Sequence, residues 1–480
     1  MNRRMVFHTT GQIIFFEALM LLIPSAVSLI YGEKCLFSFL ITIAFALCLG
    51  LALIIFSKPN DNVIYAKEGF LTVALTWLLL SAVGALPFYI SGEIPSYIDA
   101  FFETVSGFTT TGASILTDVE AMSRGLLFWR SFTHWVGGMG VLVFIMAVIP
   151  NISDRSIHIM RAEMPGPIIG KLVPKVKDTA KILYLIYVVL TFIQVVMLIL
   201  GGMDLFDSLT HAFGTAGTGG FGIKSDSIAS YSPYLQWVIT VFMLIFGLNF
   251  NLFYLMLIKR FKSAFSSTEL WIYIGIVGVS TAIITANILP IMNGFGEAVR
   301  TAAFQVSSII TTTGYATSDF NLWPTLSKTI LLVLMFIGGC AGSTAGGLKV
   351  SRVVILFKML RGEIKRMLHP RSVRVVKFEG KPLEESTLSS VAIYFAIYIF
   401  CFFAIFILIS FEPFDIETNL SAAVSCFNNV GPGFAAVGPS SSYAGYTPFS
   451  KAVLSLAMLF GRLEIFPLII AFSPFTWSKK

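Results

Sequence analysis

Four short runs of small and polar residues recur along the chain, and each holds a glycine beside threonine, asparagine or valine. They read VSGFTTTGAS at 105–114, AFGTAGTGGF at 212–221, VSSIITTTGY at 306–315 and VSCFNNVGPGF at 424–434. Glycine allows left-handed or crowded backbone, so several loops can approach one axis with their carbonyl oxygens. Backbone carbonyls can replace the water shell of a cation inside a membrane protein. The runs therefore predict a cation site.

The candidate ligands are the glycines that a gapless alignment of the four runs places in register, with the residues directly before them. They are Thr110, Thr111, Gly112, Thr218, Gly219, Thr312, Thr313, Gly314, Asn429, Val430 and Gly431. Threonine hydroxyls can add ligands to the carbonyls. For a single run, a helix C-cap or a tight turn is the alternative explanation. Four runs in register favour the cation site.

About a dozen semi-apolar residues precede each glycine. As a helix, such a stretch is about 18 Å long, roughly half of a bilayer. The stretches lie near 98–110, 206–217, 300–312 and 418–429. Short helices that end inside the membrane direct the negative ends of their dipoles toward a cation. A longer apolar segment follows each run, so the repeated unit is predicted to be helix, pore loop, helix.

The composition places these units in a membrane. The chain has 480 residues, of which 56% are hydrophobic and 12% charged, whereas soluble domains average about 25% charged residues. Apolar windows predict spans near 11–31, 36–57, 69–91, 126–149, 182–201, 234–258, 270–290, 328–337, 389–411 and 450–472. A cleaved secretory signal is the alternative for the first of these. The five cysteines form no metal or redox motif and are expected to be packing residues.

The expected fold is an all-α polytopic membrane protein with four pseudo-symmetric helix–pore loop–helix repeats around a central pore. Two extra transmembrane helices precede the repeats. The predicted boundaries are 1–66 for these two helices and 67–160, 161–263, 264–368 and 369–480 for the repeats.

The charges of the connecting segments agree with this topology. If the four short helices are re-entrant, one set of connections holds 25 basic and 10 acidic residues, and the opposite set holds 6 and 14. Because cytoplasmic loops are enriched in Lys and Arg, the basic set and both termini are predicted to be cytoplasmic. The separation makes a nucleic-acid partner a poor explanation of the basic residues. The acidic outer face would concentrate cations at the entrance.

Residues 338–349, GGCAGSTAGGLK, interrupt the second helix of the third repeat. Seven small or polar residues in succession, 340–346, favour an unwound segment, and only this repeat is expected to have a broken helix. Close helix packing through small residues is the alternative.

Two arginines lie inside predicted spans. Arg462 would cost about 2.5–3.5 kcal/mol at the centre of a helix and should face the protein interior or water. An ion pair with Glu464 is the alternative to a role in the pore. Arg130 and His134 are four residues apart on one helix face, where a packed structural pair is favoured over proton handling.

Over essentially the whole chain, the sequence resembles the Trk/Ktr/HKT superfamily of potassium transporters, and most closely the bacterial Trk membrane subunit. The most specific marks are SGFTTTGAS, GTGGF, TTTGY, NNVGPGF, GGCAGSTAGGLK and GRLEIFP. The resemblance implies that glycine at the four aligned positions accompanies potassium selectivity, with potassium as the transported and filter-bound ion and no covalent cofactor. The fourth run departs from the Thr-rich form, so the filter is expected to be chemically asymmetric.

The resemblance also implies a gate beneath the filter, with Arg462 at the constriction. The gate residues are Gly338, Gly339, Ala341, Gly342, Ser343, Thr344, Ala345, Gly346, Gly347, Lys349 and Arg462. It further implies a homodimer in the bacterial inner membrane and a cytosolic nucleotide-binding regulatory subunit. The basic segment 349–388 is the expected docking surface, and binding of lipid headgroups is its alternative.

The leading hypothesis is potassium uptake by channel-like permeation. A sodium- or proton-coupled potassium symporter is the alternative, although it needs a second ion site. An enzyme is not expected, because no nucleophile with a base, HExxH motif or paired carboxylates occurs within the spans.

Overall fold

The computed structural model describes residues 2–59, 66–140, 176–369 and 375–477. Most of the predicted basic loop 150–181 lies outside these residues, as do the end of the predicted span 126–149 and the last three residues of the chain. Within these residues all long elements are helices, and the two strands form one short hairpin.

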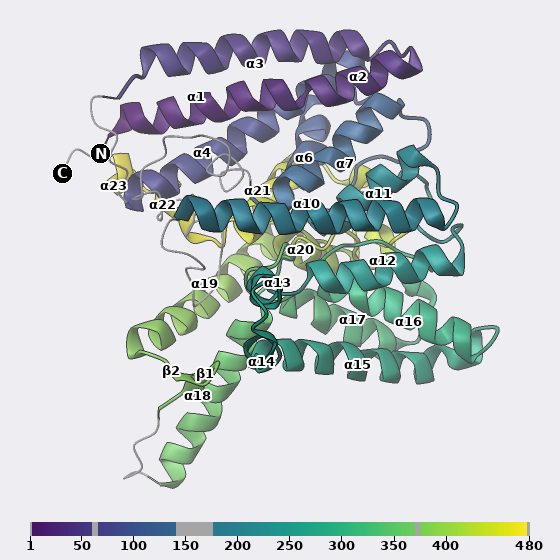
Figure 1. Ribbon diagram of the computed structural model, residues 1–480, viewed down its shortest axis with the longest axis vertical. Coiled ribbons are helices and arrows are strands. Elements are labelled where there is room, and N and C mark those ends of the chain that lie inside the picture. The colour runs from purple at the N-terminus through teal and green to yellow at the C-terminus, as the bar shows by residue number, and fades with distance from the viewer. Residues whose placement is uncertain (1, 60–65, 141–175, 370–374, 478–480) are drawn as a thin grey trace.

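Three helices come first and pack against the outside of the remaining bundle, where α1 contacts α3 and α4 (Figure 1). Their bounds are α1 Arg3–Met20, α2 Leu22–Tyr31 and α3 Leu36–Phe56. The N- and C-terminal ends of the described chain lie close together at one end of these helices (Figure 1).

Four units follow, and each has a long first helix, a short helix and a second helix. Unit one contains α4 Ala66–Gly84, α5 Leu86–Ser91, α6 Tyr97–Phe108 and α7 Arg124–Gly138. Unit two contains α10 Val176–Leu200, α11 Leu205–Gly217, α12 Pro233–Phe246, α13 Phe250–Leu257 and α14 Phe261–Phe265. Unit three contains α15 Thr268–Ile288, η2 Leu289–Ile291, α16 Phe295–Ile310, η3 Phe320–Leu322, α17 Thr325–Ile337 and α18 Val350–Leu368.

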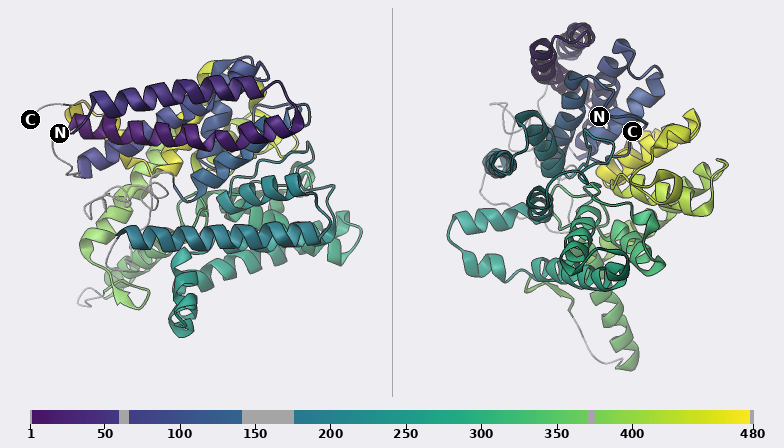
Figure 2. Two further views of the ribbon diagram at one scale, coloured as in Figure 1. Left: turned by 45° about the horizontal axis from the view of Figure 1, so that its top comes forward. Right: turned by 90° about the vertical axis from the view of Figure 1, so that its right-hand side faces the viewer.

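Unit four begins after the hairpin of β1 (Lys377–Phe378) and β2 (Lys381–Pro382). It contains α19 Glu385–Ile409, α20 Ile416–Asn428, η4 Ala435–Val437, η5 Tyr443–Gly445, α21 Pro448–Arg462, α22 Phe466–Phe472 and α23 Pro474–Trp477. Viewed from the end, the units occupy successive sectors around a common centre (Figure 2, right).

Contacts between the units follow one cyclic rule. The second helix of each unit packs against the short helix of the next, through the pairs α7–α11, α12–α16, α17–α20 and α21–α6. The last pair returns to unit one, so the arrangement closes within a single chain. The position seven residues before each aligned glycine is fully buried in every short helix: Val105, Ala212, Ser307 and Val424.

Six described helical segments are long and apolar enough to cross a membrane. They are Arg3–Tyr31, Leu36–Phe56, Lys67–Ser91, Asp178–Leu200, Thr268–Ile291 and Glu385–Ile409. The number becomes seven if the bent pair α12 and α13 counts as one span. Among the described residues, the six long segments are therefore the two N-terminal spans and the first helices of the four units, whereas the second helices are shorter or interrupted.

The expectation that only the third unit has a broken helix is wrong. Helices α12 and α13 meet at 89° across residues 247–249, and α21 is separated from α22 at residues 463–465. Glu464 and Ile465 have φ values of 52° and 69°, which a helix cannot accommodate. The sequence signal was weak at these two sites, because each break spans only three residues and lacks the long glycine-rich run.

Candidate ion pathway

The four short helices end in the same backbone conformation. The residue that turns left-handed has a φ of 55° at Thr110, 55° at Thr218, 54° at Thr312 and 57° at Asn429. The next amide then donates to the carbonyl five residues earlier, through Thr111–Ser106, Gly219–Gly214, Thr313–Ser308 and Val430–Ser425, at 2.8–2.9 Å. This closure resembles a Schellman cap. The C-cap considered as an alternative is therefore present in every unit, together with the glycines that follow it.

Two residues after each left-handed position lies a glycine with positive φ. These glycines are Gly112 (80°), Gly220 (76°), Gly314 (88°) and Gly431 (101°). In unit two the backbone thus places Gly220, and not the predicted Gly219, in register with the other three. Gly219 instead occupies the position of Thr111, whose carbonyl precedes the glycine. The GTGGF motif contains both glycines, and a gapless alignment chose the first.

The four glycines form a closed ring of close approaches. A Cβ added to any one of them would meet the carbonyl oxygen that precedes the glycine of the next loop. The distances are 2.0 Å from Gly112 to Gly219, 1.9 Å from Gly220 to Thr313, 2.3 Å from Gly314 to Val430 and 2.6 Å from Gly431 to Thr111. A real Cβ does not approach an oxygen so closely. Glycine is therefore required at all four positions by packing as well as by φ.

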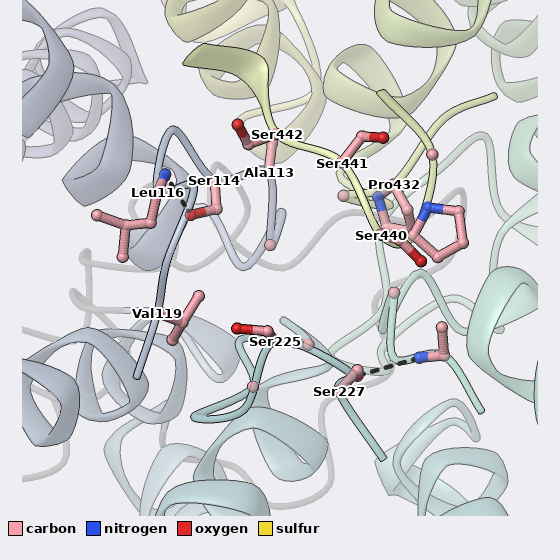
Figure 3. Close-up of a pocket in the computed structure, with 18 of the residues that line it drawn as sticks. Ala113, Ser114, Leu116, Val119, Ser225, Ser227, Pro432, Ser440, Ser441 and Ser442 are labelled. Atoms are coloured by element: carbon pink, nitrogen blue, oxygen red, sulfur yellow. Dashed lines mark hydrogen bonds between the residues drawn. The ribbon is translucent and has the colours of Figure 1, made fainter. Parts of the chain in front are cut away.

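A cavity of about 330 Å³ opens on one side of this ring and is lined by all four glycines. Figure 3 shows Ser114, Leu116 and Val119 on the left, Ser440, Ser441 and Pro432 on the upper right, and Ser225 and Ser227 below. Ser442 lies at the top, beside Ala113. Arg130 and Lys224 are the charged side chains among its described lining residues. The expected concentration of acidic residues therefore does not extend to the wall of this cavity.

The segment of residues 338–349, named here the unwound segment, lies against the other end of the loops. It separates α17 from α18, as the sequence predicts, and its residues Gly338, Gly342, Gly347 and Lys349 have positive φ. The amide of Gly346 donates to the Thr312 hydroxyl at 2.6 Å. A Cβ at Gly346 would lie 2.4 Å from the carbonyl oxygen of Asn428, so the segment contacts the third and fourth loops.

Arg462 joins the unwound segment to unit one. Its guanidinium donates to the carbonyl of Thr344 at 2.9 Å, to that of Gly138 at 2.6 Å and to that of Gly137. A cavity of about 30 Å³ lies between these groups, with Lys349 and Glu464 also in its wall. A planar guanidinium can serve several carbonyls at once, which a single ammonium group does less well.

The alternative pairing of Arg462 with Glu464 does not match the contacts of Glu464. Its carboxylate pairs with Arg352 of α18, where one of the two hydrogen bonds is 2.8 Å long. The sequence offered no local signal for this pair, because 112 residues separate the two side chains.

Arg130 and His134 are both buried and pack on the same ring, that of Phe221. Arg130 forms an ion pair with Glu103 at 2.5 Å. The Nδ1 atom of His134 lies 2.7 Å from the carbonyl oxygen of Gly107. The structural role favoured from the sequence fits these contacts, although Glu103 was not recognised as the partner.

Two kinds of comparison place the chain among known proteins. It matches the TrkH family, described as "Cation transport protein", over residues 36–273 and 279–479. It is 37% identical to the Trk system potassium uptake protein TrkH of Escherichia coli (strain K12), with 100% of both chains covered. It is 35% identical to the TrkG protein of the same strain, with 99% of both covered. These relatives are named as transport proteins, in agreement with the expectation that the chain is not an enzyme.

The fold matches as well. The crystal structure of the potassium transporter TrkH from Vibrio parahaemolyticus superimposes with a TM-score of 0.89 and 32% sequence identity, and all of both chains is covered. The resemblance found in the sequence motifs is thereby confirmed. The chain belongs to the TrkH family of cation transport proteins.

Proposed function

We propose that this chain takes up potassium across the membrane, and that the ion passes through a selectivity filter built by the four loops. The observation that carries this proposal is the closed ring, in which each glycine lies against the carbonyl that precedes the next one. Such a ring gathers backbone oxygens from four loops at one level without a fixed negative charge. The relatives named as potassium uptake proteins support the choice of ion.

In this proposal the four units are pseudo-symmetric repeats around a single-chain pore, with boundaries close to 67–160, 161–263, 264–368 and 369–480. The filter consists of the predicted residues with Gly220 added. The cyclic contacts of α7, α12, α17 and α21 with the next short helix support this arrangement. The C-terminal ends of the short helices stabilise the cation through their dipoles.

The unwound segment and Arg462 form the gate in this proposal. The unwound segment contacts the third and fourth loops, and the Arg462 guanidinium donates to carbonyls of units one and three at the same time. The basic connections face the cytoplasm. There a regulatory subunit of the nucleotide-binding Trk/Ktr type and membrane lipids are the proposed partners, and two chains form a homodimer.

A coupled symporter is the second candidate function, and Glu17 gives a specific reason to test it. This α1 side chain is fully buried, and both of its carboxyl oxygens lack a hydrogen-bond partner among the described residues. Ionisable groups at membrane depth often mark ion or proton routes. Reversal potentials measured under independent potassium, sodium and pH gradients separate the two functions, since uncoupled permeation responds to the permeant ion alone.

The filter is tested by Gly112→Ser in reconstituted vesicles, through rubidium and sodium flux. A side chain at this position must displace the Gly219 carbonyl, so we expect the selectivity for rubidium over sodium to fall about tenfold, equivalent to about 1.4 kcal/mol. Gly92→Ser is the matched control. Gly92 has a φ of 81° but nothing within 4 Å of an added Cβ, so it carries the same backbone strain without the contact. Equal selectivity in the two variants would refute the filter assignment.

A further inference from the structure

The hairpin of β1 and β2 is anchored to two helices of unit three. Its turn residues Glu379 and Gly380 have φ values of 50° and 73°, as a type I′ turn requires. Phe378 is buried, and Lys358 of α18 donates to the carbonyl of Lys377 at 2.9 Å. The hairpin therefore rests on α18 and presents Glu379 at its tip.

Glu379 caps the first turn of α15. One carboxylate oxygen accepts from the Ser267 hydroxyl and from the Glu269 amide, both at 3.0 Å, and the other accepts from the Thr268 amide at 3.2 Å. The first amides of a helix have no partner within the helix, and the positive end of its dipole attracts a carboxylate. The hairpin is thus fixed to α15 by groups that only an acidic side chain can satisfy together.

The side chain of Glu269 continues the connection from α15 into the protein. It is 5% exposed, and its Oε1 atom accepts from the amide of Ala341 at 2.8 Å and from that of Ser351 at 3.1 Å. Ala341 lies in the unwound segment, and Ser351 lies in the first turn of α18 directly after it. One carboxylate oxygen therefore holds both sides of the segment.

The unwound segment is also held by the break between α12 and α13. The Cys340 amide donates to the Gly247 carbonyl at 3.0 Å, and the Phe250 amide donates to the Gly342 carbonyl at 3.0 Å. Both of these supports come from backbone groups. Glu269, in contrast, holds Ala341 through its side chain, so a substitution can remove this contact.

We propose that Glu379 and Glu269 form a mechanical link through which the hairpin, on the face assigned to the cytoplasm, sets the position of the unwound segment. The link runs from the hairpin tip to the first turn of α15 and from there to the segment. Both glutamates are positioning residues, and their effect on transport rests on the proposed role of the segment as the gate. A displacement of the hairpin at the protein surface is thereby transmitted to the pore.

The link is tested by hydrogen–deuterium exchange of the full-length protein in lipid nanodiscs, with Glu379→Ala as the principal variant. This variant is informative because the hydrogen bonds described for Glu379 go to α15 and not to the unwound segment. We nevertheless expect hydrogen exchange at residues 338–351 to become about two- to fivefold faster. This range corresponds to the stabilisation that is lost when one anion is removed from a helix N-terminus. Glu363→Ala is the control, since this acidic residue of α18 pairs with Arg366 of the same helix. Faster exchange in Glu379→Ala alone supports the link.

Glu269→Gln provides the second variant, because its amide oxygen can still accept from both amides while the charge is lost. We expect hydrogen exchange at residues 338–351 to increase less in Glu269→Gln than in Glu269→Ala. Rubidium flux should likewise change less in Glu269→Gln than in Glu269→Ala. Exchange at this segment that stays native in Glu379→Ala, with change limited to the start of α15, would overturn the link. Because exchange is measured without transport, failure of the proposed gate would instead appear as altered exchange with unaltered flux.

Discussion

At the scale of single residues, Gly112 and Arg462 are both positioned by backbone groups of other units. Gly112 has no room for a side chain because the Gly219 carbonyl occupies that space. Arg462 is tolerated inside the bundle because its donors meet the carbonyls of Thr344 and Gly138. A buried charge without such partners would cost several kcal/mol. The same contacts make Arg462 a specific target for substitution.

Replacing Arg462 with alanine removes both a tether of the unwound segment and a positive charge beneath the loops. We expect rubidium flux in vesicles to rise about fivefold, corresponding to about 1 kcal/mol of lost repulsion. Arg462→Lys keeps the charge but cannot donate to all of the carbonyls, so its rubidium flux should lie between that of the native protein and that of Arg462→Ala. Arg366→Ala, at an exposed arginine of α18, is the control. Native flux in Arg462→Ala would exclude the constriction.

At the scale of elements, ion pairs connect the second helix of one unit to the short helix of the next. Lys451 of α21 pairs with Asp99 of α6 at 2.7 Å, and Lys328 of α17 pairs with Glu417 of α20 at 2.9 Å. Both acidic residues lie in the first turn of a short helix, where the dipole favours them. The pairs therefore reinforce the same cyclic contacts as the apolar packing.

Double-mutant cycles on thermal unfolding should distinguish these two pairs. The side chains of Lys451 and Asp99 are 7% and 25% exposed, whereas those of Lys328 and Glu417 are 25% and 49% exposed. Water screens the second pair more strongly. We expect a coupling free energy of about 1 kcal/mol for Lys451–Asp99 and a few tenths for Lys328–Glu417. A larger coupling for the exposed pair would contradict this explanation.

At the scale of the whole molecule, the connecting segments divide into a basic and an acidic set, but the cavity lined by the four glycines does not share the acidic character of the set predicted to face outward. The connections predicted to face outward carry more acidic than basic residues. Nevertheless Lys224 stands in the wall of the 330 Å³ cavity above the four glycines. Its ammonium group lies 4.2 Å from the centre of the Tyr231 ring. A positive charge at this place should reduce the local concentration of cations.

Lys224→Gln is therefore expected to increase rubidium uptake from dilute solution. At about 10 mM ionic strength the Debye length is about 30 Å, and the increase should be two- to fivefold. It should disappear near 1 M salt, where the Debye length is about 3 Å. Lys34→Gln, in the exposed connection between α2 and α3, is the control. An increase that persists at high salt would point to a steric effect of the substitution.

Much of the fold could be predicted from local pattern. The length of an apolar segment and the presence of a short run that ends in glycine can be read from neighbouring residues. The first helices, the four short helices and the interruption at 338–349 could therefore be predicted. The register of the second loop could not be fixed in the same way, because Gly219 and Gly220 are chemically identical. In the structure Gly220 has the positive φ, and a Cβ added there would lie 1.9 Å from the Thr313 carbonyl oxygen of the third unit.

The sequence by itself determined that the chain is a polytopic helical membrane protein of the TrkH family with four related loops. Hydrophobic segments and the spacing of glycines are properties of residues close together in the chain, so they can be recognised without the fold. Only the tertiary structure decided that Glu464 pairs with Arg352, that α12 and α21 end in breaks, and that Glu269 holds the unwound segment. These partners lie up to 112 residues apart. Their contacts depend on how the units pack around the centre, which no local pattern encodes.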